Sequence, residues 1–230
     1  GYVLIGGPAG TGKNVETFDG TSWSQGNDVN AVEGGANAYV VRPAAAGTQY
    51  AGLITGGCLM SFGFPTEHAY KDTMEYNGMN WSRGGQQTYA PNGREGSFGG
   101  MTGTVSAAIL AGGKGPSNTT ICACTEVYNG SNWTEVADMI TAAHDLTSAG
   151  NSNAANAVGG LSTTNANLKC NQHYDGSTWS ECLPAPGFHK QGASGGVSDD
   201  FIIASNNHSA PAQKGMVMRW DGMSWANVGP

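Results

Sequence analysis

Charged side chains are scarce in this sequence, and basic ones are the scarcest. Lys, Arg, Asp and Glu together make up 12% of the 230 residues, against about a quarter in an ordinary soluble domain. Ten basic residues stand against 17 acidic ones, which gives a net charge of −7. Because proteins hold phosphate backbones through concentrated basic patches, we expect no nucleic-acid partner.

Long hydrophobic runs are also missing. The longest, Val105–Ala111, is interrupted by Ser106, whereas a helix that crosses a membrane needs about 20 apolar residues. We therefore expect no membrane insertion. The apolar segment Tyr2–Ile5 is too short for the core of a signal peptide, and residue 1 is glycine instead of methionine. We expect residues 1–230 to form a single domain of a longer or processed chain.

Cysteine is limited to five residues, an odd number that cannot pair completely in intrachain disulfides. Cys122 and Cys124 would lie on one face of a strand, about 7 Å apart, and could form a metal site with Cys58 and His68. No second pair with zinc-ligand spacing accompanies them. We therefore favour buried thiols and expect neither a metal nor a cofactor.

What the sequence does have is glycine, 37 residues in all, and a tryptophan-containing repeat. Each copy consists of an aromatic residue, Asp or Asn, Gly, two variable residues and Trp. The five copies are Phe18–Trp23, Tyr76–Trp81, Tyr128–Trp133, Tyr174–Trp179 and Trp220–Trp225. Successive copies begin 58, 52, 46 and 46 residues apart, so the chain is built from five repeated units.

Two further landmarks precede each copy. A short apolar run ends in Gly-Gly at Gly56-Gly57, Gly112-Gly113 and Gly159-Gly160, as it does at Gly6-Gly7. Before most of these runs lies a cluster of small residues. The clusters are Ala44–Gly47, Gly99-Gly100, Ser148–Gly150 and Ala193–Gly196.

These landmarks predict four strands per unit. Asn-Gly and Asp-Gly between residues of high β-propensity are strong hairpin signals, so each aromatic residue ends one strand and each Trp begins the next. The apolar run is a short buried strand, and the small cluster is a strand in a crowded place. Four strands in 46 to 58 residues is typical of a β-propeller blade. We therefore predict an all-β fold, a β-propeller of about five four-stranded blades, with the repeat tryptophans buried between blades.

The units resemble kelch repeats, in which Gly-Gly closes the second strand, an aromatic residue lies on the third and Trp on the fourth. The resemblance covers the whole chain. It departs from the pattern in the fifth unit, where Ser205-Asn206 replaces Gly-Gly, and in the lack of a regular arginine before the small cluster. The Ala- and Gly-rich intervals also resemble kelch-like repeat proteins of tailed phages, especially marine ones.

The phase of the repeat bears on how the ring closes. The chain opens on a second strand, Tyr2–Ile5, and stops after a fourth strand, Ser224–Val228. One inner strand is therefore missing from the closing blade. We expect residues before Gly1 or a neighbouring subunit to supply it, or the edge to remain three-stranded.

One motif imitates a phosphate-binding loop. Gly7–Asn14 matches G-x-x-x-x-G-K-[ST] except at its last position. A P-loop must also open a helix, whereas Val15–Gly20 continues in repeat phase as strand and turn. We therefore interpret the segment as a loop and expect Lys13 not to bind ATP.

Carboxylates offer an alternative function. Glu16, Glu75 and Glu126 lie one or two residues before the aromatic in three units, and their repetition favours a solvated position in the blade over one active site. The Asp-Gly turns differ from the Asp box of sialidases, where the Asp lies two residues before the Gly, and the four arginines stand in unrelated repeat phases. A convergent pair of carboxylates, as in a glycosidase, remains the competing hypothesis.

The loops between second and third strands, and between blades, are predicted to share one rim. The largest insertion, Cys58–Asp72, carries exposed aromatic residues, which favour a binding surface; the alternative is that it covers a blade edge or the channel mouth. The candidate binding residues on this rim are Phe62, Phe64, His68, Tyr70, Tyr89, Arg94, His144 and His189.

Together these features predict a non-catalytic recognition or structural module. It would bind a protein or a glycan on the long-loop rim, next to neighbouring subunits of a larger assembly. The phage resemblance implies a virion component, such as a fibre, decoration or receptor-binding protein, on a virion or an extracellular surface. The alternative is a glycan-processing enzyme with carboxylates that converge near the channel.

Overall fold

The computed structural model describes residues 2–5, 14–29, 38–41, 43–61, 68–69, 71–89, 100–115, 120–204 and 216–229, with backbone only for the strands at 2–5, 38–41, 58–61 and 68–69. These residues form strands and turns, and the fold is an all-β propeller. Within the described ranges there is no helix that is long and apolar enough to cross a membrane.

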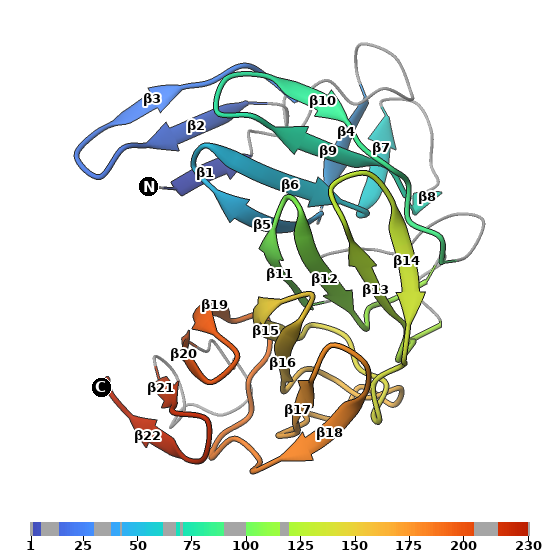
Figure 1. The fold of residues 1–230 in the computed structure, drawn as a ribbon, viewed down its shortest axis with the longest axis vertical. Helices are drawn as coiled ribbons and strands as arrows, with labels where there is room; N and C mark the ends of the chain where they lie inside the picture. Colours follow the sequence, from blue (N-terminus) through green and yellow to red (C-terminus); the bar gives the residue numbers. More distant parts are fainter. Residues whose placement is uncertain are drawn as a thin grey trace.

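Four blades make up most of the fold, each a four-stranded antiparallel sheet (Figure 1). The second unit forms β5 (Ala44–Thr48), β6 (Ala51–Thr55), β9 (Thr73–Tyr76) and β10 (Trp81–Arg83). The third forms β11 (Gly100–Thr104), β12 (Ala107–Ala111), β13 (Thr125–Tyr128) and β14 (Trp133–Val136). The fourth forms β15 (Thr147–Asn151), β16 (Ala154–Val158), β17 (Asn171–Tyr174) and β18 (Trp179–Cys182). The fifth forms β19 (Ala193–Val197), β20 (Asp200–Ala204), β21 (Val217–Trp220) and β22 (Trp225–Asn227). We call these the second to fifth blades.

The first unit is a three-stranded sheet, which we call the first sheet. It contains β1 (Tyr2–Ile5), β2 (Val15–Phe18) and β3 (Trp23–Gln25), in that order. Four complete four-stranded blades, where about five were expected, are therefore present among the described residues. Within those residues β1 pairs with β2 alone, so the inner strand that the repeat phase predicted to be missing is not supplied by the described part of the chain.

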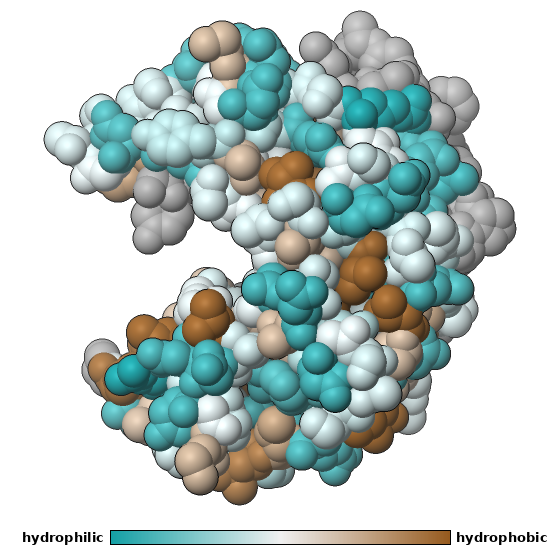
Figure 2. Space-filling model, in the orientation of Figure 1, coloured by the Kyte–Doolittle hydropathy of each residue, from teal (hydrophilic) through white to brown (hydrophobic). Residues whose placement is uncertain are grey.

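The sheets follow one another around a central space and form an open arc (Figure 1). The first sheet and the fifth blade lie at its two ends, and the space-filling view shows the opening between them (Figure 2). The four inner strands are the small-residue clusters that the sequence placed there. Gly and Ala permit the close approach of β5, β11, β15 and β19 near the axis.

The repeat turns differ in detail from the predicted hairpins. Each aromatic residue pairs with its Trp across a four-residue loop, as Tyr174 does with Trp179, and only the Gly of the loop has a positive φ. The Asp or Asn instead acts through its side chain. Asp175 Oδ1 accepts hydrogen bonds from the backbone N–H groups of Ser177 and Thr178, both at 2.8 Å. Asp19, Asn77, Asn129 and Asp221 accept equivalent bonds, so these residues cap turns.

The Gly-Gly pairs join neighbouring blades. Gly112 and Gly113 have φ of 65° and 111°, and Gly113 N donates to Ala143 O at 2.9 Å in the segment that leads to the next blade. A Cβ on Gly112 would lie 2.4 Å from Ala143 O. The pair is thus required both by the left-handed backbone and by the chain that crosses it.

Four of the repeat tryptophans, Trp81, Trp133, Trp179 and Trp225, pack against the preceding sheet, whereas Trp23 is 49% exposed and departs from the prediction. Trp133 and Trp179 are 3% and 9% exposed, which confirms the prediction for these two, and Trp81 is half-buried. Trp179 Nε1 donates to Ala137 O, and Trp225 Nε1 to Leu183 O, each at 3.0 Å. Burial of an aromatic body with a satisfied indole N–H is the usual role of Trp in a core.

The insertion in the second unit adds a small sheet. Its strands are β4 (Ala38–Val41), β7 (Cys58–Ser61) and β8 (His68–Ala69), and β7 lies between the other two. The largest predicted loop insertion therefore contains two short strands.

Candidate binding site at the inner strands

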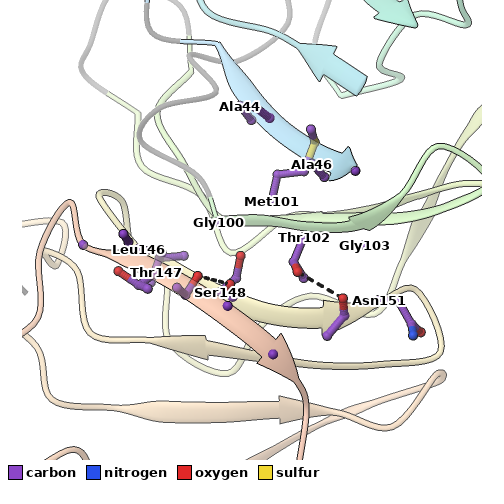
Figure 3. A pocket seen from close by; sticks show the side chains of 18 of the residues that line it. Ala44, Ala46, Gly100, Met101, Thr102, Gly103, Leu146, Thr147, Ser148 and Asn151 are labelled. Atoms are coloured by element: carbon purple, nitrogen blue, oxygen red, sulfur yellow. Dashed lines mark hydrogen bonds between the residues drawn. The ribbon is translucent and has the colours of Figure 1, made fainter. Parts of the chain in front are cut away.

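The clearest concave feature is a hollow bounded by the four inner strands, with a volume of about 970 Å³ (Figure 3). Its walls come from β5, β11, β15 and β19 and from the residues that immediately precede them. Each of these strands is the end strand of its sheet. The hollow is therefore lined by strand edges as well as by side chains.

The lining is polar but uncharged. None of the 22 described lining residues is Asp, Glu, Lys, Arg or His, and none is aromatic. Hydroxyl and amide groups come from Thr102, Thr104, Thr147, Ser148, Asn151, Gln191 and Ser194. The larger apolar side chains are Met101, Leu146 and Val197. Such a surface can form hydrogen bonds, but it offers no group for general acid–base chemistry.

Two of the lining hydroxyls lack a partner within the described part of the chain. Thr147 is 2% exposed and Ser148 is 8% exposed, and the hydroxyls of both are buried without a hydrogen bond there. A buried polar group without a partner costs roughly 1–3 kcal/mol. The neighbouring inner-strand segments bury both hydroxyls, Gly192 next to Thr147 and Gly100 next to Ser148.

Other lining hydroxyls join adjacent blades. Thr102 Oγ1 donates to Gly150 O at 3.0 Å, and Ser194 Oγ donates to Ser148 O (Figure 3). Each bond runs from the inner strand of one blade to that of its neighbour. The walls of the hollow are thus fixed to one another by side chain to backbone hydrogen bonds.

At one end of the hollow, Asp145 and Gln191 occupy equivalent places before β15 and β19. Both have a left-handed backbone, with φ of 58° and 51°. Gln191 N donates to Asp145 O at 3.0 Å, and Gln191 Nε2 donates to Asp145 Oδ1 at 3.2 Å. Lys190 Nζ lies 3.9 Å from the same carboxylate. This buried carboxylate therefore links two blades.

Four of the eight predicted site residues, Phe62, Phe64, Tyr70 and Arg94, lie outside the described residues. A fifth, His68, is in β8, where only the backbone is described. None of these five can be placed against the hollow.

The other three are described. Tyr89 is half-buried, and burial next to the thiols of Cys122 and Cys124 raises its pKa. His144 and His189 are each 1% exposed. His189 lies parallel to the indole of Trp225, with 6.5 Å between ring centroids. The structure thus places both histidines between chain segments, and a binding role for any of the eight residues stays a prediction.

The repeated glutamates do not share a solvated position. Glu126 is fully buried, and its Oε1 accepts hydrogen bonds from Thr88 N and Thr88 Oγ1, both at 2.6 Å. Glu75 accepts a hydrogen bond from the hydroxyl of Tyr128 in the next blade. Only Glu16 is exposed. The expectation of a solvated position is therefore wrong for Glu126, because neighbouring blades bury it where it binds a loop.

The structure also bears on the P-loop-like segment and on two further cysteines. After the segment that imitates a P-loop the chain continues as β2, a strand, although residues 7–13 themselves lie outside the described ranges. Cys170 and Cys182, which flank a turn, are both thiols. Burial raises the pKa of each thiol, so neither resembles a reactive cysteine.

The inner-strand hollow was only partly visible in the sequence. The small clusters, one of which includes Ser148, predicted the strands, but Thr147 belongs to no linear motif, and the hollow itself arises only where four repeats converge. A comparison with protein-family models finds no match to the chain, and a comparison with curated proteins finds no significant relative.

Proposed function

We propose that this chain is a non-catalytic recognition module of kelch-like blades that binds an extended segment of a protein partner in the inner-strand hollow. The observation that carries the proposal is the uncharged, polar lining of the hollow, which is formed by the end strands of four blades. Charged and imidazole groups, which most enzymes use, are missing from the described lining. The kelch-like character rests on the repeat landmarks, and a role within a larger assembly such as a virion rests on the sequence resemblance.

A peptide suits the hollow better than a glycan. Strand edges present N–H and C=O groups, which an extended peptide can match. Sugars commonly require an aromatic platform, and no aromatic ring lines the described hollow. Its small side chains leave room for the main chain of a ligand.

A binding array of random short peptides, run beside a glycan array, tests the proposal. Peptide hits should be lost in Ala45→Trp, because Ala45 is exposed and lines the hollow. The matched control is Thr134→Trp on β14, which is also exposed but lies outside the lining. Peptide binding that survives Ala45→Trp, or binding to glycans alone, would contradict the proposal.

A glycan-processing enzyme is the second candidate. The buried carboxylates described here have structural partners: Asp72 with Arg83 and Gln86, Glu126 with Thr88, and Asp145 with Gln191. Hydrolysis of a glycan by the purified chain would favour this candidate.

A further inference from the structure

Each interior blade has two faces with distinct neighbours. On β12, Ala108 and Leu110 pack with residues of the second blade, and we call this the upstream face. Ile109 and Ala111 pack with residues of the fourth blade, and we call this the downstream face. Both faces are buried in the interior of the arc.

In the fifth blade only one face is covered. Gly196 pairs with Phe201 as Gly103 pairs with Ala108, so β20 and β12 align residue by residue. Phe201 and Ile203, on the upstream face, are each 1% exposed. Ile202, in the place of Ile109, is 44% exposed. The downstream face of the last blade is thus an interblade surface without a blade against it among the described residues.

Besides Ile202, the downstream face of the fifth blade carries another exposed apolar side chain and one ion pair. Val197 is 55% exposed on the neighbouring strand. Arg219, half exposed, forms two hydrogen bonds of 2.8 Å with Asp200. Figure 2 shows hydrophobic residues of this arm at the border of the opening.

At the opposite end of the arc, the upstream face of the first sheet is the uncovered counterpart of this downstream face. Trp23 is 49% exposed, whereas Trp133 is 3% exposed. Its ring still packs on Phe18, with 5.0 Å between centroids, as Trp133 packs on Tyr128. The upstream face of the first sheet is therefore built like the others but has no preceding blade among the described residues.

The spacing of the repeats predicts which carbonyl oxygen would accept the indole N–H of Trp23. Trp179 and Trp225 each donate to a carbonyl 42 residues earlier, Ala137 and Leu183. Those acceptors are 46 residues apart, and the residue another 46 positions along is Gly229. By the spacing of these two interfaces the carbonyl of Gly229 is the expected acceptor for the indole of Trp23, although Trp133 donates to the hydroxyl of Thr73 instead.

A second pair of residues on the two uncovered faces is also complementary. Glu75 accepts the hydroxyl of Tyr128 across an interior interface. On the fifth blade Arg219 holds the place of Glu75, because it pairs with Ile202 as Glu75 pairs with Leu53. The ring that would face it is Phe18, which has no hydroxyl to donate. A guanidinium over a phenyl ring is a favourable cation–π contact.

We propose that the downstream face of the fifth blade binds the upstream face of the first sheet of a second copy of this chain. Within one copy the two faces lie at opposite ends of the arc (Figure 1). The contact would continue the interface that already joins the blades inside the chain. Because the two surfaces differ, association is head to tail, which generates rings or filaments and not a closed two-fold pair.

Sedimentation velocity over a range of concentrations tests this proposal. The full chain should associate, and either Ile202→Asp or Trp23→Asp should abolish association. Both side chains are half exposed, so the fold should persist, which far-UV circular dichroism and the Tm would verify. The control is Met223→Asp, at a residue that is 84% exposed in a turn.

A mixture of the two single variants gives the decisive result. Each variant retains one intact face, so the mixture should form a heterodimer that grows no further. A wild-type chain that stays monomeric, or variants that associate like wild type, would overturn the proposal. A mixture that remains monomeric would overturn the head-to-tail geometry.

Discussion

The indole nitrogen of Trp133 donates a hydrogen bond of 2.7 Å to the hydroxyl of Thr73, a residue of the preceding blade. Thr73 Oγ1 lies in turn 2.9 Å from Thr55 Oγ1, so a single tryptophan is fixed to two strands of its neighbour. The ring is 3% exposed, and it therefore contributes both packing and a buried hydrogen bond.

We predict that Trp133→Ala lowers the free energy of unfolding by about 3–5 kcal/mol. The substitution removes a buried ring and leaves the Thr73 hydroxyl with one partner fewer. Urea denaturation followed by circular dichroism measures the effect.

Trp23→Ala is the matched control for that measurement. Trp23 holds the same place in the repeat but is 49% exposed, so its loss should cost less than about 1 kcal/mol. Equal costs at the two positions would show that the repeat tryptophans do not derive their stability from the neighbouring blade.

How far the sequence predicts this fold depends on which interactions are local. The turns, the apolar second strands and the small inner strands follow from patterns of a few residues, and all are present. The burial of Glu126 could not be predicted, because its partners Thr88 and Tyr89 lie nearly 40 residues away in another blade. The repeat count alone overstated the number of four-stranded blades, whereas the phase of the repeat predicted that one unit would lack its inner strand, as the first sheet does among the described residues.

The lining of the hollow also depends on non-local contacts that the sequence does not predict. Ser148 was visible only as part of a small-residue cluster, and Thr147 belonged to no motif. Their hydroxyls become notable because Gly100 and Gly192 of the neighbouring inner-strand segments come close enough to bury them. Such convergence is set by the angle between blades, which the linear sequence does not encode in any short segment.

Gly159 should tolerate no side chain. Its φ is 67°, and a Cβ there would lie 2.3 Å from the carbonyl oxygen of His189. We predict that Gly159→Ala destabilises the fold by more than about 2 kcal/mol, from backbone strain and the clash together. Thermal unfolding of the variant would measure it.

Gly195→Ala provides the comparison. No atom lies within 4 Å of a Cβ at Gly195, and its φ is not in the left-handed region. The change should be neutral or stabilise by up to about 1 kcal/mol. If both substitutions prove neutral, the close crossing at the Gly-Gly pair is not present in solution.

The turn at Asp175 should respond to acid. Hydrogen bonds from the backbone N–H groups of Thr178 and Ser177 lower the pKa of Asp175 to about 2 from 3.8. The folded state therefore binds a proton less readily than the unfolded chain. The contribution of the turn is complete above pH 3.8 and is lost as the pH falls toward 2.

The variants Asp175→Asn and Asp175→Ala separate the hydrogen-bonded cap of the turn from its response to acid. Asn occupies the same place at Asn77 and Asn129 and accepts equivalent bonds, so the Asn variant should keep the turn without the acid response. The Ala variant should lose the cap at every pH. Proton titration by NMR of the Asp175 carboxyl, with a midpoint near 4, would contradict the expected cap.

His189 is predicted to make the fourth and fifth blades sensitive to mild acid. The ring is 1% exposed, and neither nitrogen has a hydrogen-bond partner among the described residues. Burial lowers its pKa to about 4 from 6.5. Between pH 6.5 and 4 the unfolded chain takes up a proton that the folded ring refuses, so stability falls as the pH falls through this window and is complete above it. The loss should be on the order of 2 kcal/mol.

Unfolding by urea at pH 7 and at pH 4.5 measures this effect. His189→Leu keeps an apolar group against Trp225 and should reduce the difference between the two pH values. His173→Leu is the control, because His173 is half-buried with Asn156 Oδ1 at 3.1 Å from its Nδ1, and it should leave most of the difference in place. A His189→Leu chain as acid-sensitive as wild type would show that other groups cause the response.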